Sequence, residues 1–304
     1  MTEVVIHEVG PRDGLQMEKE VVPFERKLEW LRGLIASGLD IVQVGSFVHA
    51  AKVPQMADTD RLFIELQARG VRQGAVLSGL VLNEKGMERG FAAGVDLFCM
   101  GVSASETHSR RNTGMPVAEA SERIIGMAKQ TLAAGKRVQV SVQSAFGCGY
   151  EGPVPPERVL GLVRKYVDNG ITAVSLADTA GHAVPDQVAR MYEQVFRIGS
   201  GLDCACHFHD TYGLGLANVW AAMQVGVTHV ETSVAGLGGC PFTKIAGGNV
   251  CTEDFVHMLQ RTGHRQDVKL DRLVAIAGEV AAFFGREMPG KVYRTGPMGA
   301  EGTA

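Results

Sequence analysis

The chain contains the strand-like stretch Asp203-Cys-Ala-Cys-His-Phe-His-Asp-Thr-Tyr-Gly213, which places His207 and His209 two residues apart. Side chains at positions i and i+2 of a strand share one face, with Cα atoms roughly 6.5 Å apart. At that separation two imidazoles can bind one divalent ion. Taken alone, the pair fits two metal ligands or two incidental polar groups, so the rest of the chain has to decide.

Seven further strand-like runs accompany this one, and each of the eight is followed by a helical pattern. Most runs are apolar or β-branched nearly throughout, as in parallel strands that are covered on both faces. Several helical patterns begin with Pro and end at Gly, which are boundary signals. The predicted strands are 4–10, 40–47, 76–83, 96–105, 138–145, 173–179, 203–210 and 229–235. The predicted helices are 23–37, 58–69, 84–93, 116–134, 155–169, 185–198, 214–225 and 252–262.

Eight alternating strand–helix units favour a closed (β/α)8 barrel over an open doubly wound sheet. A ninth helical pattern at 270–284 is expected to pack against the outside of the barrel. The segment 287–304 is rich in Gly and Pro and is expected to be an irregular, partly mobile tail. We therefore predict one catalytic domain over residues 1–286, including the C-terminal helix.

Composition narrows the class of protein. The 304 residues include 45% hydrophobic and 21% charged residues, which suits a globular protein with a large core. The 30 basic residues are dispersed and balanced by 33 acidic ones, so we expect no nucleic-acid partner. With no apolar run of about 20 residues and no signal-peptide pattern, we expect no membrane association and a cytoplasmic location. The six cysteines are too sparse for a disulfide scaffold, and Cys204 and Cys206 are expected to be buried packing thiols.

In a barrel, polar residues at the carboxyl ends of the strands converge at one mouth, where barrel enzymes keep their chemistry. The first strand leads into Gly10-Pro-Arg-Asp-Gly-Leu-Gln16, and the sixth ends at Asp178-Thr179. The seventh carries the two histidines, and the eighth leads into a Gly-rich segment, 234–249. The predicted fold thus gathers dispersed motifs into one candidate site.

Asp13, His207, His209 and Asn249 together offer two imidazoles, a carboxylate and an amide oxygen. This set suits a divalent ion, and its oxygen donors favour Mg²⁺ or Mn²⁺, with Zn²⁺ or Co²⁺ as alternatives. Singly, Asp13 fits a turn residue before Gly14, and Asn249 fits a loop or helix-cap residue. Only their convergence in the fold supports metal binding.

Two further residues have both a chemical and an ordinary interpretation. Arg12, beside a carboxylate, is either a surface ion-pair partner or a guanidinium that stabilises an enolate oxygen at the mouth. Cys240 lies between Gly239 and Pro241 in the Gly-rich segment, not in an apolar strand. It is either an unreactive loop cysteine or a general acid or base on a loop that closes over the substrate.

Motifs along nearly the whole chain resemble one known family. They are 8–16 (EVGPRDGLQ), Ser46-Phe-Val48, 53–57 (VPQMA), 149–152 (GYEG), Asp178-Thr179, 207–210, 233–249 and Thr252-Glu-Asp254. Together they resemble the 3-hydroxy-3-methylglutaryl-CoA lyase family, metal-dependent lyases related to the Claisen synthases and built on the TIM barrel. The Cys240 segment is the most specific of these motifs.

The resemblance implies a reaction and a role for each matching residue. Asp13, His207, His209 and Asn249 would ligate the metal, and Arg12 would polarise the thioester carbonyl. Cys240 would donate or relay a proton, and Asp178 would assist near the substrate hydroxyl. We also expect Gln43 among the catalytic residues, and Gln16, Gln139 and Thr179 beside Arg12 in substrate binding. The implied partner is a small acyl-CoA, and the implied assembly is a homodimer.

The sequence departs from the family pattern at two positions. Gln43 stands where the lyases carry Glu, and Gln139 stands where an Arg is expected. A neutral amide forms hydrogen bonds but carries no charge. The leading hypothesis is cleavage of 3-hydroxy-3-methylglutaryl-CoA to acetyl-CoA and acetoacetate. The alternatives are the same cleavage of another 3-hydroxy-3-methyl acyl-CoA such as citramalyl-CoA, a condensing synthase, and a catalytically impaired barrel with a binding or scaffold role.

Overall fold

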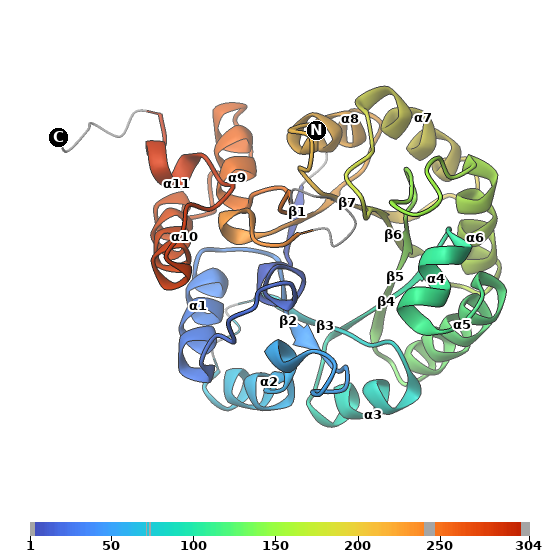
Figure 1. Ribbon diagram of the computed structural model, residues 1–304, viewed down its shortest axis with the longest axis horizontal. Coiled ribbons are helices and arrows are strands. Elements are labelled where there is room, and N and C mark those ends of the chain that lie inside the picture. The colour runs from blue at the N-terminus through green and yellow to red at the C-terminus, as the bar shows by residue number, and fades with distance from the viewer. Residues whose placement is uncertain (1–3, 71, 73, 240–246, 299–304) are drawn as a thin grey trace.

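The computed structural model describes residues 4–298 apart from 71, 73 and 240–246. Its eight strands are hydrogen-bonded in sequence order and close into a parallel barrel, as predicted (Figure 1). The strands are β1 (Val5–Glu8), β2 (Ile41–Ser46), β3 (Val76–Leu80), β4 (Leu97–Ser103), β5 (Arg137–Gln143), β6 (Ala173–Asp178), β7 (Asp203–Phe208) and β8 (His229–Thr232).

Helices surround the barrel (Figure 1). Buried apolar side chains form the core between the helices and the strands. The helices are α1 (Phe24–Ala36), α2 (Thr59–Ala68), α3 (Glu84–Ala92), α4 (Glu106–Thr113), α5 (Val117–Ala133), α6 (Pro156–Asp168), α7 (Pro185–Phe196), α8 (Gly215–Gln224), α9 (Thr252–Arg261), α10 (Leu270–Phe284) and α11 (Val292–Thr295). None of the helices in the described part of the chain is both long and apolar enough to span a membrane.

Helix α10 packs on the outside of the barrel against α1, as the sequence predicted. The Trp30 ring meets the Phe283 ring edge-on with centroids 5.8 Å apart, and its indole N–H donates to Glu279 at 3.2 Å. Cys204 and Cys206 are buried in β7, which confirms that they pack in the core.

The predicted irregular tail contains one short ordered element in the part that the structure describes, while residues 287–291 and 296–298 form no helix or strand. Residues Val292–Thr295 form the short helix α11, which packs against α9 and α10. Asp254 holds this segment because its carboxylate accepts hydrogen bonds from the backbone N–H groups of Lys291 and Val292. Met288 and Val292 are buried. The composition pointed to a loop, but these tertiary contacts order the segment.

Helix α4 was missed because its sequence, Glu-Thr-His-Ser-Arg-Arg-Asn-Thr, has no apolar periodicity. Its boundary signals were nevertheless present. Ser105 caps the helix by accepting the backbone N–H of His108 at 3.1 Å, and Gly114 ends it with φ +79°. Such caps compensate for weak helix propensity.

Candidate metal site and active-site pocket

The turn after β1 places Asp13 at the mouth of the barrel. Residues Gly10–Gly14 form a π-helical turn in which Arg12, Asp13 and Gly14 all donate their backbone N–H to the carbonyl of Val9. Pro11 is the second residue of this turn, where its missing N–H costs nothing. The predicted first strand therefore ends two residues early, and the tight turn directs the Asp13 side chain toward β7.

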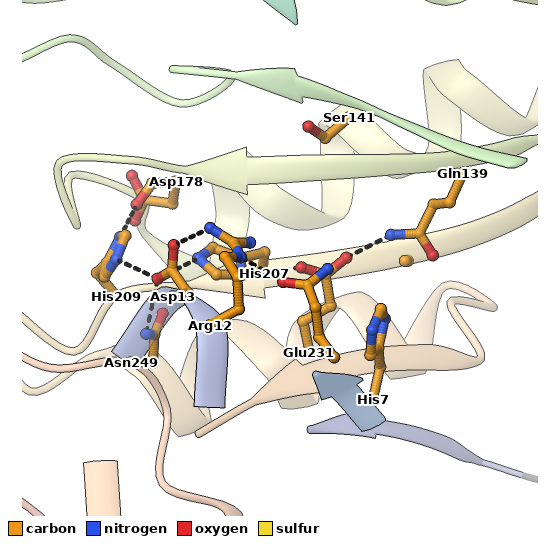
Figure 2. A network of polar contacts seen from close by, with 12 residues as sticks. His7, Arg12, Asp13, Gln139, Ser141, Asp178, His207, His209, Glu231 and Asn249 are labelled. Carbon is orange, nitrogen blue, oxygen red and sulfur yellow. Dashed lines mark hydrogen bonds and ion pairs between the residues drawn. The ribbon is translucent and has the colours of Figure 1, made fainter. Parts of the chain in front are cut away.

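Asp13, His207 and His209 form a buried cluster whose ligand atoms all lie within 4.8 Å of one another (Figure 2). Asp13 Oδ2 is 3.8 Å from Nε2 of His207 and 3.8 Å from Nε2 of His209. His207 lies within β7 and His209 follows it, and their ring centroids are 5.1 Å apart. The structure thus brings three of the four predicted ligands together around one point.

Asn249 completes the predicted set. Its backbone pairs with His209, and its Nδ2 donates to Asp13 Oδ2 at 2.9 Å and to the Leu237 carbonyl at 3.0 Å. Its Oδ1 is buried and has no hydrogen-bond partner among the described residues. A buried carboxamide oxygen is costly to leave unpaired, and it is a good ligand for a hard divalent cation. The donor set therefore fits a divalent ion.

Hydrogen bonds at the Nδ1 atoms orient both imidazoles. His207 Nδ1 is 2.9 Å from Glu231 Oε2, and His209 Nδ1 is 2.9 Å from the backbone oxygen of Asp178. Because both partners only accept, each Nδ1 has to carry the proton, which leaves Nε2 of the neutral ring unprotonated. Both lone pairs then face Asp13, as metal-binding histidines require.

The carboxylates of the site are held ionised. Burial acts to raise the pKa of Asp13, but the Arg12 guanidinium beside it outweighs burial and keeps that pKa well below its usual range. Burial likewise opposes ionisation of Glu231, but contact with His207 brings the pKa of Glu231 to about 2. Ionised Asp13 is the form that binds a metal.

Arg12 is held between two predicted site residues. Its Nη1 donates to Asp13 Oδ1 at 2.5 Å, and its Nε donates to Oε1 of Gln43, which is buried in β2. The guanidinium plane is therefore fixed beside the ligand cluster (Figure 2). A neutral amide at Gln43 orients Arg12 without neutralising its charge.

Sequence reasoning missed Glu231, which connects two of the named residues. Its Oε1 accepts a hydrogen bond from Gln139 Nε2 at 2.6 Å, while its Oε2 binds His207 (Figure 2). The signal was an acidic residue inside a predicted strand of the barrel, since a carboxylate buried there is rarely without partners. Gln139 therefore holds the carboxylate that orients His207, one of the predicted ligands.

The structure does not bring the Asp178 carboxylate into the pocket. Its two oxygens accept the backbone N–H groups of His182 and Ala183, each at 2.9 Å, and the side chain is fully buried. Only its backbone oxygen reaches the site, through His209. This geometry supports a positioning role, in place of the predicted one at the substrate hydroxyl.

A cavity of about 360 Å³ opens beside the ligand cluster at the mouth of the barrel. Gln16 and Thr179 line it as predicted: Gln16 donates to Asp13 at 3.2 Å, and the Thr179 hydroxyl accepts the backbone N–H of Ser144 at 2.9 Å. Cys240, the predicted proton donor, lies outside the described residues. The other lining residues are Arg12, Asp13, Met17, Val48, Val53, Leu80, Leu82, His108, Asn112, Ser141, Gln143, Ala177, His207, His209, Glu231 and Gly239.

A family model described as HMGL-like matches residues 3–280, which is most of the chain. The chain belongs to the HMGL-like family. It is therefore an acyl-CoA lyase of the hydroxymethylglutaryl-CoA lyase type, a carbon–carbon lyase, as the sequence resemblance implied.

Two curated relatives within this HMGL-like group differ in substrate. The chain is 36% identical to a hydroxymethylglutaryl-CoA lyase of Bacillus subtilis, over 95% of either chain. It is 35% identical to an (R)-citramalyl-CoA lyase of Chloroflexus aurantiacus, over 98% of this chain and 96% of the relative. An HMG-CoA lyase from an Acinetobacter species, solved with coenzyme A and 3-methylmalate, superposes with TM-score 0.92 at 33% identity, covering 99% of this chain and 98% of that one.

Proposed function

We propose that this HMGL-like protein cleaves 3-hydroxy-3-methylglutaryl-CoA to acetyl-CoA and acetoacetate, using Mg²⁺ or Mn²⁺. The observation that carries the proposal is the buried Asp13–His207–His209 cluster with the unpaired Oδ1 of Asn249 beside it. The cluster lies against Arg12 in a cavity large enough for a small acyl group. Two oxygen donors beside two imidazoles favour these hard cations.

A divalent ion held by Asp13, His207, His209 and Asn249 would acidify the tertiary hydroxyl of the substrate. Cleavage breaks the bond between the carbinol carbon and the methylene next to the thioester. The electron pair of that bond passes into the thioester as the enolate of acetyl-CoA. Arg12, fixed by Gln43 and Asp13, provides a guanidinium N–H for the developing enolate oxygen.

A proton has to reach the enolate carbon to complete acetyl-CoA. We assign this step to Cys240, because this residue directly follows Gly239, which lines the pocket. The segment is rich enough in glycine to close over a bound acyl-CoA. In this scheme the thiol donates to carbon, and the proton lost from the hydroxyl restores it.

Citramalyl-CoA is the second candidate substrate, and two neutral side chains favour it. Gln43 contacts Arg12 and Gln139 contacts Glu231, so neither position contributes a charge to the pocket. A change of charge next to a carboxylate-bearing substrate alters which acid is accepted. Cleavage of citramalyl-CoA uses the same carbon–carbon bond chemistry but releases pyruvate in place of acetoacetate.

The test is release of acetyl-CoA from purified protein loaded with Mn²⁺ or Mg²⁺. We expect cleavage of 3-hydroxy-3-methylglutaryl-CoA with a higher kcat/KM than that of citramalyl-CoA, and loss of activity in His207→Ala and Cys240→Ser. A preference for citramalyl-CoA would replace the first substrate by the second. Release from neither thioester would refute both.

A further inference from the structure

His7 is a buried histidine of β1 that the proposed mechanism does not use. Its Nε2 atom lies 2.8 Å from the hydroxyl oxygen of Ser78 on β3. Its Nδ1 atom is also buried and has no hydrogen-bond partner among the described residues. Buried polar side-chain atoms are seldom left without a partner, so an orphaned ring nitrogen calls for an explanation. The contact with Ser78 explains only one side of this imidazole.

The strand register places His7 beside the carboxylate that orients a predicted metal ligand. His7 of β1 pairs with Glu231 of β8, and Glu231 pairs in turn with His207 of β7. Paired residues on adjacent strands lie about 4.8 Å apart and share one face of the sheet. Figure 2 shows His7 and His207 on opposite sides of Glu231. The three residues therefore form one row across three neighbouring strands.

The Glu231 carboxylate can accept more hydrogen bonds than the two that it receives. Its Oε2 binds His207 Nδ1 at 2.9 Å, and its Oε1 accepts from Gln139 Nε2 at 2.6 Å. A carboxylate offers about four lone-pair sites, so each oxygen has room for another donor. Because Glu231 is buried, every added donor helps to stabilise its negative charge.

The protonation state of His7 suits it to be that donor. Burial lowers the pKa of His7 to about 4, against the raising effect of the Glu231 carboxylate, which acts on the ring more strongly than any other charged group. The imidazole is therefore neutral at pH 7 and carries one proton, on Nδ1 or on Nε2. The Ser78 hydroxyl can donate to Nε2 or accept from it. A negative charge beside the ring favours the tautomer in which Ser78 donates and Nδ1 keeps the proton.

We propose that His7 is a positioning residue for the metal site, which directs an Nδ1–H toward the Glu231 carboxylate and so holds that carboxylate against His207. Ser78 fixes the tautomer by donating to Nε2. Glu231 lines the cavity, whereas His7 is not among its described lining residues, so His7 acts through Glu231. This inference rests on the metal site of the proposed function and not on which acyl-CoA is cleaved.

Two substitutions distinguish the ring nitrogens of His7. The amide nitrogen of Asn can take the place of Nδ1, whereas that of the longer Gln reaches the place of Nε2 beside Ser78. We expect Mn²⁺ affinity, measured by equilibrium dialysis, to fall roughly 5- to 20-fold in His7→Gln and to stay within about 3-fold of wild type in His7→Asn. His257→Gln, at a partly exposed position on α9, is the matched control and should leave the affinity unchanged. Equal affinities in His7→Asn and His7→Gln, or the reverse order, would overturn the assignment.

A double-mutant cycle tests whether His7 acts through Glu231. In the Glu231→Gln background the carboxylate is already lost, so adding His7→Gln should lower Mn²⁺ affinity by less than about 2-fold more. Losses that multiply would show that His7 acts independently of Glu231 and would refute the proposed route. Thermal melts of all the variants establish that each one is folded.

A measurement on metal-free protein keeps this inference separate from the proposed function. Proton–nitrogen NMR spectra of protein labelled with ¹⁵N-histidine report the tautomer of each ring, and the signals of His7 are those lost in His7→Asn. We expect the Nδ1–H tautomer for His7, and a His207 Nδ1–H signal that shifts more in His7→Gln than in His7→Asn. If wild type binds no Mn²⁺ but gives this result, the proposed function fails and the role of His7 stands. An Nε2–H tautomer of His7, or a His207 signal that does not respond to His7→Gln, would refute that role.

Discussion

At the scale of single residues, the geometry of the candidate metal site depends on neighbouring side chains and carbonyls that orient the histidines and Arg12. Glu231 and the Asp178 carbonyl each hold the Nδ1 atom of one histidine, and Gln43 holds Arg12. These partners determine which nitrogen faces Asp13 and how the guanidinium plane lies. A site of this kind is sensitive to residues that never touch the substrate.

Glu231→Gln tests the orientation of His207. The glutamine amide still has an oxygen that can accept the His207 N–H, but it carries no negative charge. Its NH₂ group cannot accept the hydrogen bond from Gln139, so the amide can also turn to place its NH₂ group toward His207. We expect Mn²⁺ affinity to fall by roughly 10- to 100-fold, with activity partly restored at high metal concentration. Equilibrium dialysis and a metal titration of activity measure both effects. Glu279→Gln, at an exposed position on α10, is the control, and an unchanged metal affinity in Glu231→Gln would contradict this role.

Arg12→Lys separates stabilisation of the enolate from metal binding. An ammonium cannot contact Gln43, Asp13 and an enolate oxygen in the fork geometry of a guanidinium. We expect kcat to fall on the order of 100-fold, the effect of removing one oxyanion donor, while Mn²⁺ affinity changes only slightly. Steady-state kinetics and metal titration of the same preparation decide this, and parallel losses would show that Arg12 serves the metal site.

At the scale of elements, two segments far apart in the sequence form the part of the barrel mouth that holds Asp13 and Asn249. One is the turn Gly10–Gly14, and the other is the extended segment Gly247-Gly248-Asn249, called here the crossing segment. The backbone of this crossing segment lies very close to that of Gly236, since a Cβ on Gly248 would lie 1.7 Å from the Gly236 oxygen. The Gly248 carbonyl also accepts the backbone N–H of Asp210 at 2.8 Å. Asn249 reaches Asp13 because this backbone approach is so close.

Gly248→Ala should therefore displace Asn249, lowering both the melting temperature and the Mn²⁺ affinity, the latter at least several-fold. Gly126→Ala is the matched control, because a Cβ there would meet nothing within 4 Å and the residue lies inside α5. That control should be more stable by about 0.5–1 kcal/mol. Thermal melts with and without metal measure both variants, and a Gly248→Ala protein with unchanged metal affinity would contradict the link.

Two buried carboxyl groups, those of Glu8 and Glu253, hold the backbone at Val234 and Ala235, just after β8, by hydrogen bonds. Glu8 accepts the backbone N–H groups of Gly10 and Val234, and Glu253 accepts that of Ala235, whose φ is +60°. Burial raises the pKa of Glu8 to about 7 and that of Glu253 to about 8, against the lowering effect of their hydrogen bonds. Both groups thus stay protonated in the fold at pH values where the unfolded chain is ionised.

This linkage gives a pH dependence of known sign. The stability contributed by Glu253 is full below pH 4.5, its unfolded pKa, and is lost as the pH rises through about 8. Over that window the loss approaches about 1.4 kcal/mol per pH unit. Glu253→Gln should flatten the decline in the free energy of unfolding between pH 5 and pH 8, measured by urea titration. Parallel curves for wild type and variant would contradict the raised pKa.

At the scale of the whole molecule, the candidate ligands come from both ends of the barrel sequence. Asp13 follows β1, the histidines lie in and just after β7, and Asn249 follows β8. A bound ion would therefore join the first and last parts of the closed sheet. With free metal at 100 times its Kd, ligation to the folded state alone adds about 2.7 kcal/mol to the free energy of unfolding.

Thermal melts in Mn²⁺ and in a chelator test this stabilisation. We expect a higher melting temperature with the metal, and no difference between the two conditions for Asp13→Asn, which removes a ligand charge. An equal shift in wild type and variant would place the metal elsewhere. The homodimer and the cytoplasmic location remain predictions, and light scattering of the metal-loaded protein tests the first.

The short-range sequence pattern, with its apolar runs and polar strand ends, predicted the barrel and the residue types expected to bind a metal. Apolar runs, Gly and Pro signals act over a few residues, so strand order and helix positions could be read from the sequence. The same locality explains the errors: α4 has no apolar period, and α11 is ordered by Asp254 from a distant helix.

The sequence by itself determined the eight strand–helix units, the His207–His209 pair and the family resemblance. Only the tertiary structure decided which polar groups pair. Glu231 contacts Gln139 across 92 residues and Asn249 contacts Asp13 across 236, and both contacts exist because the barrel closes in one register. The physical reason is that the partner of a side chain depends on the register between strands and on the face of the sheet to which the side chain points. No short stretch of sequence encodes that register.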